Sequence, residues 1–171
     1  MKKMFYSAFV LFVFLLFSIA FTGCKKSGSG GGGGEYYVKF RANSSNINYT
    51  NQMGLYFTAT QSASSHIIII SGFNTAASNI SLQVYSDAPI TAGSYSNYSL
   101  SSGIPVGVII GYQDESTGQL FNSGPITSDA VITITEVNTN FIKGSFSGTL
   151  KKSGLADINI TAGEFYVKKN G

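Results

Sequence analysis

Apolar and polar residues alternate along most of this chain, and this alternation constrains the fold more than any other feature of the sequence. From residue 35 onward, turn residues separate short segments in which every second residue is apolar; Val38, Phe40 and Ala42 are one such set. A period of two places successive side chains on opposite faces of a β-strand. No stretch has apolar residues at the spacing of a helical face. The sequence therefore predicts an all-β domain.

The alternating segments predict about ten short strands, a number and spacing typical of an antiparallel β-sandwich or a flattened barrel. Short polar or glycine-containing connections predict hairpins at 114–118, 138–140, 151–154 and 162–163, so we expect the C-terminal half to be a meander. The expected strands are 36–42, 55–61, 66–73, 80–85, 94–100, 106–113, 119–123, 130–137, 141–151, 157–161 and 164–168.

Two local patterns refine this prediction. Residues 67–70 are consecutive isoleucines and are therefore apolar on both faces, which predicts a central strand covered on both sides, with Ile69 buried. Gly144 and Gly148 lie on either side of Phe146 on an expected inward face. Glycines at such positions mark a bend or the close approach of a facing chain.

The N-terminal residues have the layout of a secretory signal. Lys2 and Lys3 precede a run of 17 residues, 5–21, that is apolar except for one tyrosine and two serines, and small residues follow it. A retained transmembrane anchor is the alternative. Seventeen residues are at the lower limit for crossing a hydrocarbon layer of roughly 30 Å. No stop-transfer cluster follows the run, which favours cleavage.

Residues 21–24, Phe-Thr-Gly-Cys, resemble the lipobox of bacterial lipoproteins, with phenylalanine in place of the usual leucine. The resemblance implies that the Cys24 thiol is diacylglycerol-modified, that signal peptide 1–23 is cleaved between Gly23 and Cys24, and that the new amine is acylated. Cys24 is the only cysteine, so no disulfide forms within the chain. The glycine-rich residues 24–34 predict a flexible lipidated tether, and 35–171 form the predicted all-β domain.

The basic excess of the chain lies before this domain. The net charge is +3, but residues 35–171 hold seven of the 11 basic residues and all eight acidic ones. The domain therefore offers no basic surface for a nucleic acid, and the membrane is the expected contact, through the N-terminal lipid. Gly28, Gly30 and Gly33 fit a G-x-G-x-x-G pattern, but no strand precedes and no helix follows them, so no phosphate-binding loop is predicted.

Residues capable of catalysis are few. His66 is the only histidine, and we expect a structural strand-edge residue there, because no cysteine of the domain and only scattered carboxylates could complete a triad or a zinc site. The adjacent acids Asp114 and Glu115 are expected in a solvated turn and not in a calcium loop, which needs more oxygen ligands. The sequence therefore predicts no catalytic residue, no metal site and no cofactor.

Tyrosines provide the best ligand-binding signal. Tyr95 and Tyr98 lie in the segment Ser-Tyr-Ser-Asn-Tyr-Ser, 94–99, where their rings could stack on a sugar or contact a protein. Cross-strand packing is the alternative, because tyrosine favours strands.

Five segments carry a second resemblance: Val-Lys-Phe-Arg-Ala-Asn at 38–43, Ala-Gly-Ser-Tyr at 92–95, Val-Ile-Thr-Ile-Thr at 131–135, Ile-Lys-Gly-Ser-Phe-Ser-Gly at 142–148 and Ile-Asn-Ile-Thr-Ala-Gly-Glu-Phe at 158–165. They are similar to Bacteroidetes-type lipoproteins of a domain family without assigned function. The resemblance implies a lipid-anchored β-sandwich in a Gram-negative envelope, and it transfers no catalytic residue.

We therefore expect a monomeric, non-enzymatic binding or structural domain, anchored at the outer membrane on its periplasmic or surface face, with a glycan or an envelope protein as partner. A glycan-binding accessory lipoprotein that uses surface tyrosines is the alternative, and a hydrolase ranks third. A glycan-binding domain should gather two or three tyrosines around a concave face, whereas a protein-binding one should keep them scattered or packed.

Overall fold

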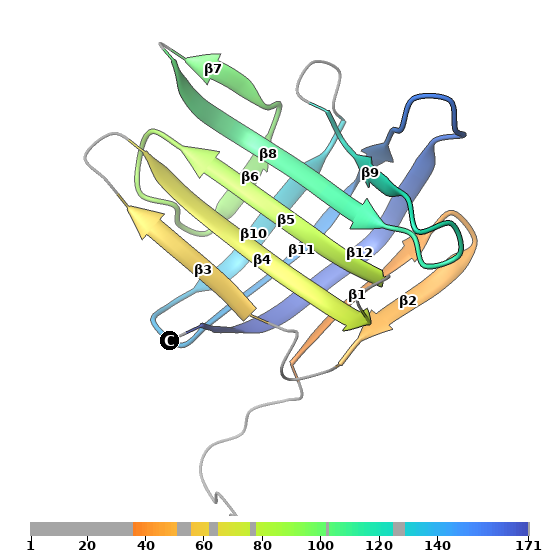
Figure 1. Cartoon of the computed structure of the whole chain (residues 1–171). Helices are drawn as coiled ribbons and strands as arrows, with labels where there is room; N and C mark the ends of the chain where they lie inside the picture. The colour runs from red at the N-terminus through yellow and green to blue at the C-terminus, as the bar shows by residue number, and fades with distance from the viewer. Residues whose placement is uncertain are drawn as a thin grey trace, which may run out of the picture. The chain divides into compact units, whose positions relative to one another are not determined.

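The computed structural model describes residues 36–50, 56–61, 65–75, 78–101, 103–124 and 129–170, which form twelve strands (Figure 1). None of these residues belongs to a helix long and apolar enough to cross a membrane. The strands are β1 (Tyr37–Ala42), β2 (Ser45–Tyr49), β3 (Tyr56–Gln61), β4 (His66–Thr75), β5 (Ser78–Ser86), β6 (Gly93–Ser96), β7 (Ser99–Ser101), β8 (Ile104–Gln113), β9 (Leu120–Asn122), β10 (Val131–Val137), β11 (Phe141–Leu150) and β12 (Ile158–Lys169).

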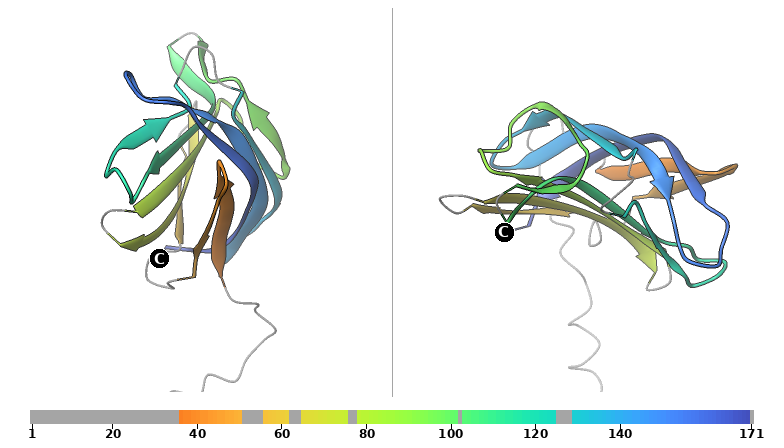
Figure 2. Two further views of the ribbon diagram at one scale, coloured as in Figure 1. Left: turned by 90° about the vertical axis from the view of Figure 1, so that its right-hand side faces the viewer. Right: turned by 90° about the horizontal axis from the view of Figure 1, so that it is seen from above.

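The strands form two six-stranded layers, which Figure 2 shows from the side and from above. The first sheet has the order β6-β10-β11-β12-β1-β2. The second has the order β3-β4-β5-β8, with β7 and β9 both paired to β8. Every pairing within a sheet is antiparallel. A short parallel pairing of Lys168 and Lys169 with the start of β3 links the two sheets. The predicted all-β antiparallel sandwich is confirmed.

The core lies between the two sheets. Val38, Phe40 and Ala42, which the alternation places on one face, are all buried. Aromatic rings fill the centre: the ring of Phe40 contacts those of Tyr112 and Phe146 at centroid distances of 5.3 and 5.7 Å. The core residues lie between Val38 and Val167, and residues 33–171 form a compact unit of their own. The domain of residues 35–171 therefore has the core it needs to fold without the leader.

Three of the four predicted hairpins are confirmed. The 114–118 turn joins β8 to β9, 138–140 joins β10 to β11, and 151–154 lies in the connection from β11 to β12. The predicted meander holds only for β10, β11 and β12, because β9 belongs to the second sheet.

The hairpin at 162–163 was a wrong prediction. The expected strands 157–161 and 164–168 are one continuous strand, β12, with a bulge between them. Ala162 has a positive φ of 49°, which absorbs the extra residue of the bulge. The bulge changes the inward-facing set from Ile158 and Ile160 to odd-numbered residues, beginning with Gly163.

Two further strand predictions need correction. The expected strand 94–100 is two strands, because the chain leaves the first sheet after β6 and joins the second sheet as β7. Asn97 forms the corner with a positive φ of 52°, a conformation that asparagine tolerates. Strand β2 was not predicted, because in its sequence Ser-Asn-Ile-Asn-Tyr only Tyr49 is fully buried.

The run of isoleucines lies in a central strand, as predicted, but it is not covered on both sides. β4 lies between β3 and β5. Ile68 and Ile70 face the core and are buried, whereas Ile67 and Ile69 are half-buried on the outer face of the second sheet. Cross-strand neighbours Thr58 and Gln83 flank Ile69 there.

This alternation predicts unequal costs for two neighbouring substitutions. Ile70→Ala should lower the free energy of unfolding by about 2 to 5 kcal/mol, because it removes a fully buried side chain and leaves a cavity. Ile69→Ala should cost only about 1 kcal/mol, since that side chain is partly exposed on the outer face of the sheet. Urea denaturation of the two variants measures the difference, and the shared loss of strand propensity cancels. Equal costs would mean that the outer face is covered in solution.

In the first sheet, the aromatic rings of two phenylalanines pack against glycines on the neighbouring strand. Gly144 pairs with Phe165, and Phe146 pairs with Gly163. A Cβ atom on Gly144 would overlap the Thr133 carbonyl oxygen and lie 2.5 Å from Cζ of Phe165. A Cβ atom on Gly163 would likewise overlap the carbonyl oxygen of Phe146. The prediction that Gly144 marks a close approach is confirmed, and the pairing with Gly163 explains it.

Candidate functional site

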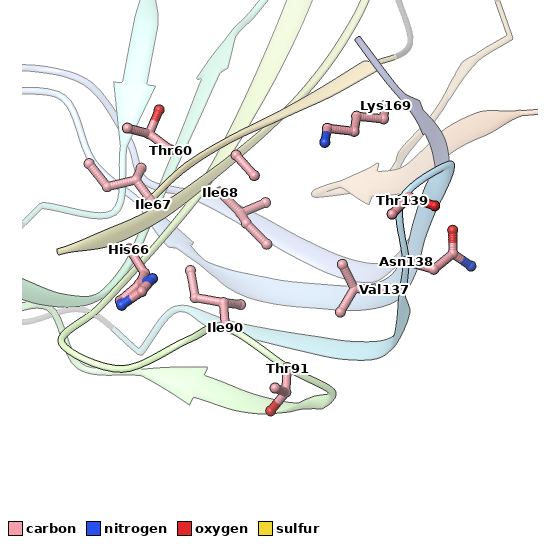
Figure 3. A pocket seen from close by; sticks show the side chains of 11 residues that line it. Thr60, His66, Ile67, Ile68, Ile90, Thr91, Val137, Asn138, Thr139 and Lys169 are labelled. Carbon is pink, nitrogen blue, oxygen red and sulfur yellow. The ribbon is translucent and has the colours of Figure 1, made fainter. Parts of the chain in front are cut away.

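One end of the sandwich holds a cavity of about 360 Å³, which we call the His66 cavity (Figure 3). Both sheets contribute to its wall, together with the loop between β5 and β6 and the hairpin between β10 and β11. The lining residues are Ala59, Thr60, His66, Ile67, Ile68, Ile90, Thr91, Val137, Asn138, Thr139 and Lys169.

The cavity is present because the two sheets separate beyond their short link. β3 pairs with β12 only opposite Lys168 and Lys169, so along the rest of β3 no described strand covers its second edge. The inward-facing residue of β3 at this level is Ala59, which pairs with buried Ile68 but is itself exposed. A small side chain at this position leaves room that a larger one would fill.

His66 lies at one side of the cavity and faces inward, like Ile68 and Ile70 farther along β4. Its side chain is nine-tenths buried, with 9% of the residue exposed, and among the described residues its Nδ1 has no hydrogen-bond partner. A buried polar atom without a partner costs about 1–3 kcal/mol, so its retention calls for an explanation. The strand-edge prediction located the start of β4 correctly but did not anticipate the cavity.

Lys169 lies on the opposite side of the cavity (Figure 3). The bulge in β12 makes Gly163, Phe165 and Val167 face inward, and Lys169 is the next residue of that set. Within the described part of the chain, Lys169 makes no ion pair, and none of the described lining residues is acidic. Sequence reasoning missed this lysine because the last predicted strand, 164–168, ends one residue before it.

The wall of the cavity is mixed in character. Ile68, Ile90 and Val137 supply apolar surface, and six of the eleven lining residues carry polar side chains, a combination found in small-molecule sites. In the part of the chain that the structure describes, no hydrogen bond joins His66 to a hydroxyl or carboxylate, which a triad requires.

The adjacent acids Asp114 and Glu115 lie in the turn between β8 and β9, away from the His66 cavity. The Asp114 carboxylate accepts hydrogen bonds from the Ser116 hydroxyl at 2.6 Å and the Thr117 hydroxyl at 2.8 Å. Burial alone would raise the pKa of Asp114, but these hydrogen bonds lower it overall. The carboxylate therefore stabilises its own turn. Among the described residues, no group of three or more His, Cys, Asp or Glu side chains could hold a metal ion.

The structure does not bring Tyr95 and Tyr98 together as a ligand surface. The Tyr95 hydroxyl donates to the Thr91 carbonyl at 2.9 Å and accepts from the Thr91 amide at 3.0 Å, which closes the preceding loop. The ring of Tyr98 packs edge-on against Tyr85 of the second sheet at 5.6 Å. A ligand site at these two residues stays a prediction. The lipidation and cleavage residues Cys24 and Gly23 lie outside the described residues.

A different group of tyrosines gathers on the first sheet. The ring of Tyr166 contacts Tyr36 at 4.8 Å, Tyr37 at 6.4 Å and Phe141 at 5.2 Å, and we call these four residues the Tyr166 cluster. The Lys143 ammonium lies 4.7 Å from the centre of the Tyr166 ring. Outward positions in the alternation could have indicated Tyr37 and Tyr166, but their pairing across strands is a property of the sheet register.

Comparison with protein-family models, curated proteins and solved structures yields no match for this chain. Its function must therefore be inferred from the geometry above.

Proposed function

We propose that this chain is a lipid-anchored cell-envelope protein whose β-sandwich binds a small, largely apolar molecule in the His66 cavity without transforming it. The unpartnered Nδ1 of nine-tenths-buried His66 is the observation that carries this proposal. A bound molecule with one hydrogen-bonding group would satisfy that atom and cover the apolar wall. The few ionisable groups around the cavity favour binding over catalysis.

The sequence supports the location. The Gly23-Cys24 site and the basic, apolar leader favour acylation of Cys24, and the glycine-rich tether 24–34 would let the domain stand off from the membrane. The proposed site of action is the outer membrane, on its periplasmic or surface face, with the domain acting as a monomer. The resemblance to Bacteroidetes-type lipoproteins agrees with this location.

The neutral dye N-phenyl-1-naphthylamine tests binding in the domain of residues 35–171, because its fluorescence rises in apolar sites. Ala59→Phe should weaken dye binding at least tenfold, since the new ring fills the space beside Ile68. The protein has one histidine, so its imidazole NMR signals can be assigned without ambiguity. The imidazole proton signals of His66 should shift when dye is added to the wild type.

Thr58→Phe is the matched control, because Thr58 is the exposed neighbour on the outer face of the same strand. This variant should bind the dye within about twofold of the wild type, a difference of roughly 0.4 kcal/mol. If Ala59→Phe binds as well as the wild type, or if the dye leaves the His66 signals unmoved, the proposal is wrong.

Glycan binding is the second candidate, and the Tyr166 cluster favours it. Three tyrosine rings converge there beside Lys143, and aromatic faces with polar tips suit sugar stacking. Glycan binding at this cluster would be unaffected by Ala59→Phe, so the same variant separates the two candidates.

A further inference from the structure

We infer that the His66 cavity selects an organic acid, a molecule with an apolar body and one carboxylate, which pairs with Lys169 while the body contacts Ile68, Ile90 and Val137. This inference rests on the proposed function, because it assigns the ligand class of the same cavity. Three observations carry it: the position of the ammonium, the charge balance of the wall and the distance between the two polar sides.

The ammonium of Lys169 can pair with an anionic group of a ligand while that group stays partly exposed to water. The residue is exposed, although its side chain lines the cavity (Figure 3). An anion at this position keeps part of its hydration, which avoids most of the penalty for burying an ion pair. The apolar body can meanwhile enter the dry part of the cavity, where its burial supplies the affinity.

The charge balance favours an anion over a cation. Among the described lining residues, Lys169 is cationic, His66 adds an imidazole, and none is acidic. Two other lysines form ion pairs with acidic side chains. The ammonium nitrogen of Lys39 lies 2.9 Å from a carboxylate oxygen of Glu164, and that of Lys143 lies 3.5 Å from one of Glu136. Within the described chain, Lys169 has no such partner.

The two polar sides also set the form of the ligand. Lys169 pairs with Phe57 and His66 pairs with Gln61, so four residues of β3, about 13 Å at 3.3 Å per residue, separate the two levels. Because the two residues join the wall at different levels, we expect the acid of the ligand to pair with Lys169 and a second polar group, which can donate or accept one hydrogen bond, to contact Nδ1 of His66.

Two dyes that share one skeleton test this inference on the domain of residues 35–171. 1-Anilinonaphthalene-8-sulfonate is N-phenyl-1-naphthylamine with an added sulfonate, which stands in for the carboxylate. Lys169→Met should weaken binding of the sulfonate dye about fivefold to tenfold and change binding of the neutral dye less than twofold. Raising the salt concentration to 0.5 M should weaken the sulfonate dye in the wild type but not in Lys169→Met.

Lys168→Met is the matched control, because it removes the same charge from the neighbouring outward position of β12. It should leave both affinities within twofold. Equal weakening by the two lysine variants, or equal changes for the two dyes, would overturn the inference. The proposed function would still stand in that case, provided that Ala59→Phe weakens binding of the neutral dye. If Ala59→Phe does not weaken it, the proposed function itself is refuted.

Discussion

Replacing Cys24 with serine is expected to abolish incorporation of an alkyne-tagged fatty acid into the full chain and to leave the precursor uncut. The proposed modification needs the thiol, since the diacylglycerol is attached through sulfur, and cleavage follows that attachment. Each buried acyl CH₂ contributes about 0.8 kcal/mol, so the variant loses the anchoring of two or three chains and keeps only the apolar leader of the uncut precursor. Labelling in cells followed by gel electrophoresis measures both effects, because the uncut precursor is larger than the processed chain.

A relocated thiol provides the control. In a double variant with Cys24→Ser and Ser27→Cys, labelling should stay absent, because the thiol no longer follows Gly23 at the cleavage site. Label that returns in the double variant would indicate ordinary thioester acylation of any exposed cysteine. Label that persists in Cys24→Ser alone would contradict the lipoprotein assignment.

The second large effect concerns Gly144. We expect Gly144→Ala to lower the free energy of unfolding by about 3 kcal/mol, because the added methyl group overlaps the Thr133 carbonyl oxygen and the ring of Phe165. A backbone oxygen cannot turn aside as a flexible side chain can, so β10 and β11 must move apart. The midpoint of urea denaturation measures the cost.

Gly111→Ala is the matched control for this prediction. Gly111 also lies in a strand, β8, but its nearest atom to an added Cβ is Cδ1 of Leu120 at 4.0 Å. Alanine there should be neutral or stabilising by up to about 1 kcal/mol, because it restricts the unfolded chain. Similar values for Gly144→Ala and Gly111→Ala would show that the sheet accommodates the methyl group and that the close approach is not tight.

The alternation of apolar and polar residues predicted those features of the fold that depend only on which face of a strand each side chain occupies. The buried set of Val38, Phe40 and Ala42, the two-layer architecture and the turns at 114–118 and 138–140 could all be predicted from residue type and spacing. These features depend on local chemistry, because a strand with one apolar face must bury it.

The errors lie where one residue changes the direction of the chain. Ala162 and Asn97 both adopt positive φ, one inside a bulge and one at a corner between the sheets. Neither residue type indicates a positive φ as strongly as glycine does, so neither change of direction was predicted. The candidate site was missed because it is assembled from distant segments: Lys169 lies one residue beyond the last predicted strand, and only the folded sheets bring it to the same cavity as His66. The outward position of Ile69 was missed for another reason: an isoleucine run does not reveal whether a second layer covers it.

The shared strand β12 has a consequence for the order of assembly. Val38 near the start of the domain pairs with Phe165 near the end of the described chain, and the same strand supplies the link to β3. Contacts so distant in sequence form late and slowly. During synthesis, β1 must therefore wait for β12, so the first sheet cannot be completed until nearly all of the domain has been made. Under the secretion that we propose, the same order would leave the domain unfolded until its last strand had crossed the membrane.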